Sequence, residues 1–253
     1  MTTDLIVHPI LYLYTDFGVG SLYVGQLHGI IAPHLPRIQT VDLCHELEPC
    51  KPRSAAYLLA ALGPFLTVPA VVVGVVDPGV GTARAPILIR GEKLSLIGPD
   101  NGLFSQIVRQ FPGRVYRLDA ISARPLSASF HGRDLFVPWA LRLLVDPESR
   151  PESDLEPFTQ PIVGSDWPQQ IQEVIHIDRY GNAITGWMGE EVNHNRSLRI
   201  GPHTLAYRTT FGEAVYGTAF WYVNSLGLVE IACNQKSASD ALDIHVADLF
   251  VWL

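Results

Sequence analysis

The sequence predicts an α/β amino-terminal domain followed by a smaller, β-rich and barrel-like carboxyl-terminal domain. Strand-like and helix-like runs alternate through the first 150 residues, which is the pattern of an α/β fold. Five prolines, mixed with acidic residues, fall between Pro147 and Pro168 and indicate a connector. The runs that follow are short, rich in β-formers and separated by Gly, Asn and Pro. We therefore expect an α/β domain over residues 1–150, a linker over 151–169 and a β-rich substrate-binding domain over 170–253.

Each element of the first domain follows from its side chains. The run Ala70–Val76 is apolar and largely β-branched, so it predicts a strand buried on both faces, as in a parallel sheet. An apolar helix is expected from Leu135 to Leu144. The remaining predicted elements are strands at Ile10–Tyr14, Arg37–Leu43, Ile87–Ile89 and Leu94–Ile97, and helices at Tyr23–Ala32, Arg53–Leu62 and Leu103–Gln110.

The second domain is predicted from short apolar runs that are bounded by turn residues. Such runs are typical of a small β domain, because Gly, Asn and Pro end strands and favour turns. The predicted strands are Val174–Asp178, Ser197–Ile200, Ala219–Val223 and Leu228–Ala232.

Composition limits the possible partners. Of the 253 residues 17% are charged, the formal net charge is −7 and the pI is about 5.7. No basic block is present, which argues against nucleic-acid and anionic-membrane partners. The amino terminus lacks a secretory pattern, and the longest apolar stretch, near Leu66–Val76, is too short to span a bilayer. The chain has an odd number of cysteines, namely Cys44, Cys50 and Cys233. We therefore expect free thiols and a cytoplasmic location.

Polar and glycine-rich residues follow three of the predicted strands directly. The segments are Thr15-Asp16-Phe17-Gly18, Asp77-Pro78-Gly79-Val80-Gly81 and Pro99-Asp100-Asn101-Gly102. Open α/β sheets bind ligands at the carboxyl ends of their strands, so these side chains would converge on one edge. Any one segment taken alone is better explained as a turn, and Asp16 could form an Asx turn as well as bind ribose hydroxyls.

Asp77, Arg84 and His131 are the candidate catalytic residues. At such an edge, an acid, a guanidinium and an imidazole could orient one water molecule where bulk solvent is scarce. The arrangement suits hydrolysis without a metal and without a covalent intermediate. His131 alone could equally cap or pack against the helix that follows it. Arg133 and Asp134 are expected to be structural, at the start of that helix.

The second domain offers polar groups at the ends of its predicted strands. Asp178 and Asn182 could bind an ammonium and a carboxylate, or could simply close a hairpin, and Asn224-Ser225 and Asn234 leave the same two possibilities. In the first domain, the segment Asp42–Cys50 contains potential metal ligands. It lacks the paired Cys or His spacing of a zinc site, so we expect a strand exit and a loop there, and no metal.

Taken together, these segments resemble the S-adenosylmethionine hydroxide adenosyltransferases, which are adenosine-forming hydrolases related to fluorinases and chlorinases. The motifs are ordered and spread over nearly the whole chain, which makes the resemblance specific. They are Thr15-Asp16-Phe17-Gly18, Tyr23-Val24-Gly25, Val76-Asp77-Pro78-Gly79-Val80-Gly81-Thr82, Pro99-Asp100-Asn101-Gly102-Leu103, Phe130-His131-Gly132-Arg133-Asp134, Asp178-Arg179-Tyr180-Gly181-Asn182 and Asn224-Ser225-Leu226-Gly227.

The resemblance implies hydrolysis of S-adenosyl-L-methionine to adenosine and L-methionine, by a homotrimer with its active sites between subunits. The methionine derivative is the substrate, and no cofactor is implied. Asp77, Arg84 and His131 would hold and polarise the attacking water. The implied substrate contacts are Asp16 with the ribose hydroxyls, Asp178, Asn182 and Ser225 with the methionine ammonium and carboxylate, the backbone around Cys233, Asn234 and Gln235 with the adenine edge, and Tyr180 or Phe211 with the face of the base.

The chemistry fits these residues. A sulfonium loses a neutral thioether, so the leaving group needs neither a general acid nor a metal. The missing element is a positioned, partly desolvated water in line with the C5′–S bond, and positioning can contribute several kcal/mol, of the order of 7 kcal/mol or more in favourable cases. The cluster of acid, guanidinium and imidazole could take up the proton of the water as attack proceeds.

Two alternatives remain open at this stage. A sensor for adenosine or S-adenosylmethionine would use the same pocket without turnover. A halogenase is disfavoured, because the resemblance associates halogenation with a non-acidic residue in place of Asp77. Fluorinases are further associated with a Thr in place of Val80 and a Ser in place of Gly132.

Overall fold

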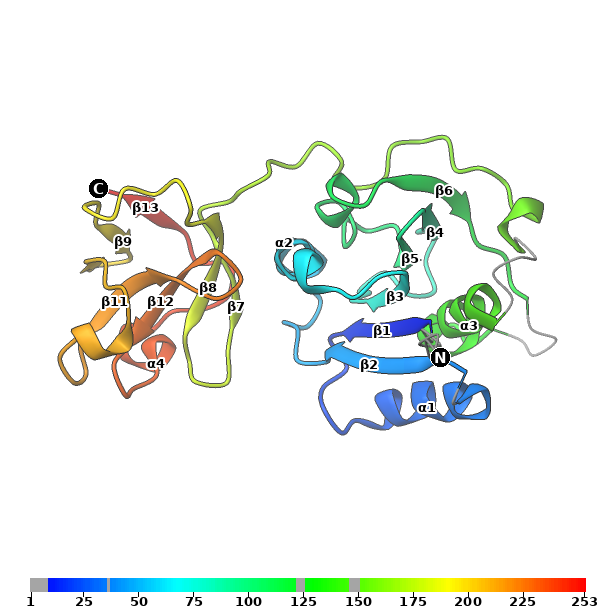
Figure 1. The fold of residues 1–253 in the computed structure, drawn as a ribbon, viewed down its shortest axis with the longest axis horizontal. Coiled ribbons are helices and arrows are strands. Elements are labelled where there is room, and N and C mark those ends of the chain that lie inside the picture. The colour runs from blue at the N-terminus through cyan, green and yellow to red at the C-terminus, as the bar shows by residue number, and fades with distance from the viewer. Residues whose placement is uncertain (1–8, 36, 122–125, 146–150) are drawn as a thin grey trace, which may run out of the picture. The chain divides into compact units, whose positions relative to one another are not determined.

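The computed structural model describes residues 9–35, 37–121, 126–145 and 151–253, and these form two compact units (Figure 1). Unit 1 comprises the described residues of Met1–Pro52 and Phe65–Ser165, and unit 2 comprises those of Arg53–Pro64 and Asp166–Leu253. Unit 1 is α/β and unit 2 is built on antiparallel sheets, which confirms the predicted order of the two architectures. The predicted domain bounds of 1–150, 151–169 and 170–253 stay predictions.

Unit 1 is built on one six-stranded sheet with the order β2-β1-β3-β5-β4-β6. Strands β1, β2, β3 and β5 pair in parallel, whereas β4 pairs antiparallel with both β5 and β6. The two residues between β4 and β5 are too few for a parallel crossover, so this pair forms a hairpin. The strands are β1 (Ile10–Thr15), β2 (Gln39–Cys44), β3 (Ala70–Val75), β4 (Pro86–Gly91), β5 (Leu94–Pro99) and β6 (Gly113–Arg117).

The central strand β3 is the one that the run of valines predicts. All six of its residues are buried, and it pairs in parallel with β1 on one side and β5 on the other. The carboxyl ends of β1, β3 and β5 therefore lie at the same edge of the sheet. The three polar segments that follow these strands emerge there, as the sequence predicts.

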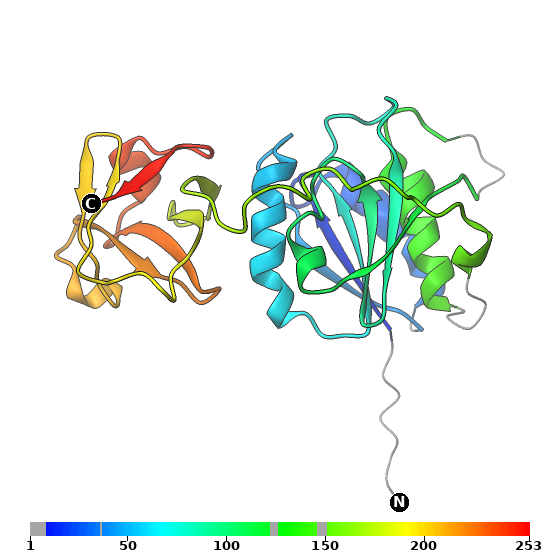
Figure 2. The same cartoon turned by 90° about the horizontal axis from the view of Figure 1, so that it is seen from above.

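Helices α1 (Leu22–Ile31) and α3 (Val137–Val145) cover one face of this sheet (Figure 2). Alternate residues of the strands, such as Leu11, Leu13, Val71 and Val73, form a buried cluster with both helices. A π-helical turn at Gly132–Phe136 leads into α3, so the helix begins later than predicted. Such turns occur often at functional sites, and this one directly follows His131.

The predicted helix at Leu103–Gln110 is wrong. The segment forms turns and a short 3₁₀ helix at Ile107–Arg109, and residues 102–107 are buried without interruption, rather than along one stripe. Leu103 and Phe104 pack against Gly74, where a Cβ atom would lie 2.9 and 2.8 Å from their side chains. Close packing on the sheet overrides the apolar spacing that suggested a helix.

Unit 2 contains two antiparallel sheets, with the orders β11-β12-β8-β7 and β10-β9-β13, and helix α2 groups with them from Arg53 onward. Arg53 Nη1 donates to Glu173 at 2.9 Å, and the Tyr57 hydroxyl donates to the Pro168 carbonyl at 2.6 Å. The elements are α2 (Pro52–Leu62), β7 (Val174–Ile177), β8 (Ala183–Met188), β9 (Leu198–Ile200), β10 (His203–Leu205), β11 (Ala219–Val223), β12 (Leu228–Cys233), α4 (Ala238–Leu242) and β13 (Phe250–Trp252).

The core of unit 2 draws on both sheets. Trp221 and Ile231 come from the larger sheet and Leu198 and Phe250 from the smaller one, and all are fully or almost fully buried. The strand pairs found among the described residues do not close into a ring, so the barrel-like form stays a prediction. No helix in the described part of the chain is long and apolar enough to cross a membrane.

Candidate active site

Unit 1 carries a small pocket at the carboxyl edge of β1 and β3, which we call the charged pocket. Its volume is about 130 Å³. Asp16 and Phe17 enter it directly after β1, and Asp77 enters it two residues after β3. The lining residues are Asp16, Phe17, Tyr23, Cys50, Val75, Asp77, Val80, Ser129, Phe130, His131 and Gly132.

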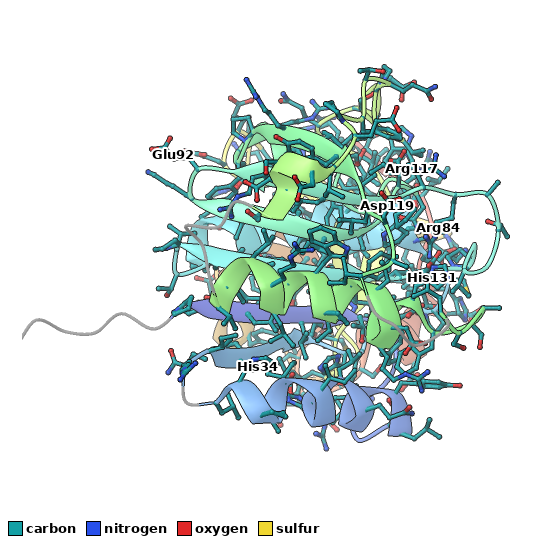
Figure 3. All side chains as sticks on the ribbon, turned by 90° about the vertical axis from the view of Figure 1, so that its right-hand side faces the viewer. His34, Arg84, Glu92, Arg117, Asp119 and His131 are labelled. Carbon is teal, nitrogen blue, oxygen red and sulfur yellow. The ribbon has the colours of Figure 1, made fainter. Side chains whose placement is uncertain are left out.

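Arg84 links the two other candidate catalytic residues, and Figure 3 shows it close to His131. Its Nε donates to both carboxylate oxygens of Asp77 at 3.1 Å, and Nη2 donates to Asp77 Oδ2 as well. The same Nη2 lies 2.9 Å from His131 Nδ1. The side chains of Asp77 and Arg84 are only 4% and 10% exposed, so water competes little for this ion pair. The structure thus joins the three residues into one chain of contacts.

The contact with Arg84 determines the protonation of His131. A guanidinium can only donate, so Nδ1 of His131 must accept and the neutral ring carries its proton on Nε2. Burial lowers the pKa of His131, and the charge of Arg84 lowers it further, whereas Asp77 and Asp134 act in the opposite direction. His131 is therefore neutral near pH 7 and offers an Nε2 donor.

The loop between Asp77 and Arg84 depends on glycine at one position in particular. Gly81 has a φ of +77°, and a Cβ atom there would lie 2.5 Å from the Ala128 carbonyl oxygen. A larger residue would strain the backbone and also push against the segment that precedes His131. Gly81 therefore keeps the loop close to that segment, and so keeps Arg84 within reach of His131.

The third polar segment, after β5, supports the edge instead of lining the pocket. Asn101 Nδ2 donates to the Val76 carbonyl at 2.8 Å, and Asp100 accepts from the Val163 backbone N–H at 2.9 Å. Neither side chain lines the charged pocket. For this segment the interpretation as a turn is the better one.

Asp16 faces the charged pocket from the end of β1. Its Oδ2 accepts from the Cys50 backbone N–H at 3.1 Å, which leaves Oδ1 available to a ligand. Burial raises the pKa of Asp16; the Cys50 bond lowers it, and the nearby charge of Asp77 raises it again. A carboxylate held in this way is suited to accept hydrogen bonds from hydroxyl groups.

An aromatic cluster forms the wall of the charged pocket. The rings of Phe17, Tyr23 and Phe130 lie 5.1 to 5.8 Å apart, and the Arg133 guanidinium lies 5.1 Å from the Phe130 ring. Arg133 also forms two hydrogen bonds with Asp134, at 2.6 and 2.9 Å. This pair is structural, as expected, because it fixes the wall behind Phe130.

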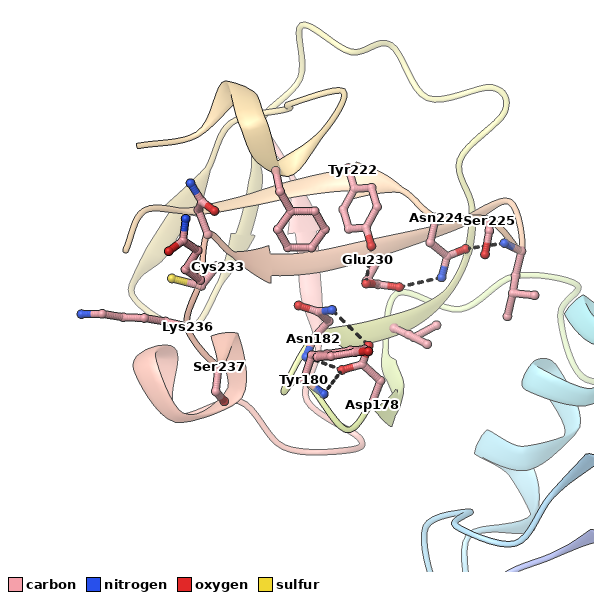
Figure 4. Close-up of a pocket in the computed structure, with 15 residues that line it drawn as sticks. Asp178, Tyr180, Asn182, Tyr222, Asn224, Ser225, Glu230, Cys233, Lys236 and Ser237 are labelled. Carbon is pink, nitrogen blue, oxygen red and sulfur yellow. Dashed lines mark hydrogen bonds between the residues drawn. The ribbon is translucent and has the colours of Figure 1, made fainter. Parts of the chain in front are cut away.

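Unit 2 has a larger pocket of about 990 Å³, which we call the turn pocket (Figure 4). This is at the upper end of the range for small-molecule sites, about 300–1,000 Å³. All eight substrate-binding residues predicted for the second domain line it. They are Asp178, Tyr180, Asn182, Phe211, Ser225, Cys233, Asn234 and Gln235.

Asp178 organises the turn between β7 and β8. Its Oδ1 accepts from the backbone N–H groups of Tyr180 and Asn182 at 2.8 Å, and Oδ2 accepts from Asn182 Nδ2 at 3.0 Å. Gly181 in this turn has a φ of +79°, and a Cβ atom there would lie 2.1 Å from Ser237 Oγ. The hairpin interpretation therefore holds for Asp178, whose Oδ1 already accepts two bonds, whereas Oδ2 retains one lone pair for a further donor.

Tyr222 and Glu230 are polar residues of the turn pocket that the sequence does not single out. Glu230 accepts from the Tyr222 hydroxyl at 2.5 Å and from Asn224 Nδ2 at 2.7 Å. Burial raises the pKa of Glu230 although both hydrogen bonds lower it, and burial also raises the pKa of Tyr222. The available signal was a single acid within the apolar strand Leu228–Cys233, since a buried charge needs partners.

The remaining predicted residues differ in how freely they could meet a ligand. Tyr180 is 79% exposed, whereas Phe211 packs edge to face against Phe220 and Tyr222. Asn234 is engaged: its backbone N–H and carbonyl bond Thr218 and Gly217, and its amide donates to Ala214. Gln235, the next residue, also lines the turn pocket and has a φ of +57°.

Two models of known protein families match most of this chain. The family model for the N-terminal domain of SAM hydroxide adenosyltransferases matches residues 11–150, and that for the C-terminal domain matches residues 172–251. The chain belongs to the SAM hydroxide adenosyltransferase family. Both pockets lie on segments that these two models cover.

Similar proteins agree with this membership of the SAM hydroxide adenosyltransferase family. The chain is 38% identical to an (R)-S-adenosyl-L-methionine hydrolase of Thermus thermophilus, over 92% of this chain and 95% of the relative. It is 34% identical to a protein of the same name from Salinispora arenicola, over 95% and 96%. A crystal structure of an uncharacterised conserved protein from Thermotoga maritima matches with a TM-score of 0.80 and 26% identity, over 96% of this chain and 99% of that one.

Proposed function

We propose that this chain hydrolyses S-adenosyl-L-methionine to adenosine and L-methionine. The observation that carries the proposal is the buried link from Asp77 through Arg84 to His131 at the ligand-binding edge of the sheet. The family and the printed names of the relatives support the same substrate. A sensor would need the turn pocket, but it would have no use for a buried cluster that can orient water.

Asp77, Arg84 and His131, which we call the triad, each have a different role toward one water molecule. Nε2–H of His131 donates to the water oxygen, and Asp77 accepts one of its protons as the oxygen attacks C5′. Arg84 holds both groups in place and favours the negative charge that develops on the nucleophile. The C5′–S bond breaks and its electron pair stays on sulfur, giving neutral methionine thioether. No metal or cofactor takes part in this step.

The two pockets hold different parts of the substrate. Asp16 accepts the ribose hydroxyls beside the triad. In the turn pocket, Asp178, Asn182 and Ser225 bind the methionine ammonium and carboxylate. The Cys233–Gln235 segment meets the adenine edge, and Tyr180 or Phe211 covers the face of the base.

The reaction is tested by incubating the pure protein with S-adenosyl-L-methionine in ¹⁸O-labelled water. Adenosine labelled on its 5′ oxygen, together with methionine, is expected, because water attacks C5′. Unchanged substrate that stays tightly bound would instead identify a sensor. Formation of halogenated adenosine in the presence of chloride or fluoride would identify a halogenase.

We further propose a homotrimer whose active site combines the charged pocket of one subunit with the turn pocket of a neighbour. The water-activating groups and the candidate methionine-binding groups belong to different compact units, which supports a composite site. Native mass measurement should give three times the mass of the chain. Co-expressed Asp77→Ala and Asp178→Ala chains should recover part of the activity that each lacks alone, whereas a fully active monomer would exclude this arrangement.

A cytoplasmic location is also proposed. Cys44, Cys50 and Cys233 are all unpaired thiols, and free thiols persist in reducing compartments. Cell fractionation with an antibody against the chain would test this.

A further inference from the structure

Outside both pockets, three potential metal ligands come together at the start of unit 1. His28 lies on α1, Asp42 on β2 and His45 just after β2. Nε2 of His28 lies 3.0 and 3.1 Å from the two oxygens of Asp42, and Nε2 of His45 lies 3.1 Å from Asp42 Oδ1. One ligand atom from each residue lies within 4.8 Å of the others. The sequence interpretation missed this group, because His28 is separated from the Asp42–Cys50 segment by a helix end and a strand.

His45 gives a second, independent observation that points to a cation site. Its side chain is only 4% exposed, and its Nε2 has no hydrogen-bond partner among the described residues, although Asp42 lies close by. At the opposite side of the ring, Nδ1 lies 2.7 Å from Thr15 Oγ1. If Nδ1–H donates to Thr15, Nε2 presents a lone pair toward a carboxylate oxygen. A metal ion placed between Nε2 and the carboxylate would satisfy both acceptors, whereas without a metal a proton on Nε2 must join them.

We propose that His28, Asp42 and His45 bind a divalent first-row transition metal such as Zn²⁺. Two imidazoles and a carboxylate are a common ligand set for such ions, and a metal-bound histidine usually bonds a second group through its other nitrogen, as His45 bonds Thr15. Zinc bonds of about 2.1 Å place tetrahedral ligand atoms about 3.4 Å apart, so the contacts of 3.0 and 3.1 Å to Asp42 would lengthen by a few tenths of an ångström, and any wider pair of ligand atoms would close toward the same separation. Water completes the coordination, since His28 and Asp42 are 41% and 45% exposed.

The position of the site gives the metal a structural effect on the charged pocket. The His45 carbonyl accepts from the Gly18 N–H at 2.7 Å, and Thr15 Oγ1 accepts from the Phe17 N–H at 3.2 Å. These bonds hold the segment that carries Asp16. An ion on His45 would therefore fix this segment from behind, without touching the substrate.

The test uses the untagged full-length protein, freed of metal by a chelator and titrated with Zn²⁺ without substrate. Calorimetry should give one Zn²⁺ per chain, and added Zn²⁺ should raise the melting temperature, because ligands that bind the folded state stabilise it. His28→Ala and Asp42→Asn should each lower the affinity by about tenfold or more, and both side chains are exposed enough for the fold to survive. Co²⁺ should give a visible absorption band in the wild type that His28→Ala abolishes.

His34→Ala is the matched control, because His34 lies just after α1 and outside the cluster. It should bind Zn²⁺ as the wild type does. The proposal is wrong if the wild type binds no stoichiometric Zn²⁺, in which case imidazole–carboxylate contacts alone hold the cluster. It is equally wrong if His28→Ala binds Zn²⁺ as tightly as the wild type.

Discussion

Different interactions stabilise the charged pocket and the turn pocket. The charged pocket depends on contacts between ionised or polar side chains, with Arg84 bonded to Asp77 and His131. The turn pocket depends on backbone turns, in which Asp178 and Asn224 accept from main-chain N–H groups. Charged contacts of side chains suit a proton transfer, whereas turns provide a fixed surface for a large ligand. Substitutions should therefore affect the two pockets in different ways.

The largest effect is expected at the triad. Asp77→Ala, Arg84→Ala and His131→Ala should each lower kcat by about a hundredfold or more, because a positioned acid or base contributes that much. The affinity for S-adenosyl-L-methionine should change far less, since the turn pocket remains intact. Steady-state kinetics together with calorimetric binding would separate the two effects.

His245→Ala is the control for these variants, since its side chain is 73% exposed and lies in unit 2. It should keep the wild-type rate. If all three triad variants also kept that rate, the water-activating role would be wrong.

A substitution in the turn between β7 and β8 should mainly lower the stability of the protein. Gly181→Ala adds a Cβ atom 2.1 Å from Ser237 Oγ at a φ of +79°, so we expect a loss of about 2–3 kcal/mol in the free energy of unfolding. Gly201→Ala is the matched control, because it shares a positive φ of +51° but meets nothing within 4 Å. It should cost only the backbone strain, about 1 kcal/mol. Equal losses for both variants in denaturant titrations would show that the contact with Ser237 is unimportant.

The strand pattern alone pointed to the charged pocket, whereas the roles of the turn-pocket residues were named through the family resemblance. Apolar runs located β1 and β3, and parallel pairing then brings their polar ends to one edge, so Asp16 and Asp77 could be placed together. His131 and Arg84 reach that edge through loops, and only the structure gives their contact. The strands β6, β8, β10 and β13 are missing from the prediction, because short runs carry little periodicity.

Tertiary contacts explain what the sequence did not indicate. Glu230 and Tyr222 face each other on paired strands, and this register could not be derived from either strand alone. His28 joins Asp42 because α1 packs beside β2, which no local spacing encodes. The residues missed are thus those whose partners lie on a different helix or strand.

Asp178→Asn should distinguish charge from turn geometry. The amide oxygen can still accept from the N–H groups of Tyr180 and Asn182, so the turn should survive. The loss of the negative charge should raise KM for S-adenosyl-L-methionine by about tenfold, the value of one charged hydrogen bond, with a smaller change in kcat. Asp178→Ala should add a loss of stability. An unchanged KM in Asp178→Asn would limit this carboxylate to the turn.

The smallest effect is expected from Asp16→Asn, and it depends on pH. Burial raises the pKa of Asp16 in the folded protein, and the charge of Asp77 adds to this. A carboxyl group with a raised pKa contributes its full stability below about pH 3.9, the unfolded value, and loses it as the pH rises through the folded pKa. The ionised Asp16 therefore destabilises the fold at neutral pH.

Asn removes that cost and can still accept from the Cys50 N–H. Asp16→Asn should thus be more stable than the wild type at pH 7.5, by at most about 1 kcal/mol because solvent screens a half-buried charge. The gain should shrink toward pH 4.5, whereas the exposed Asp119→Asn should show no such trend. Melting temperatures at both pH values measure this. If the variant is less stable than the wild type at pH 7.5, the ionised carboxylate stabilises unit 1. The burial of Asp16 in the charged pocket would then carry no net cost in stability.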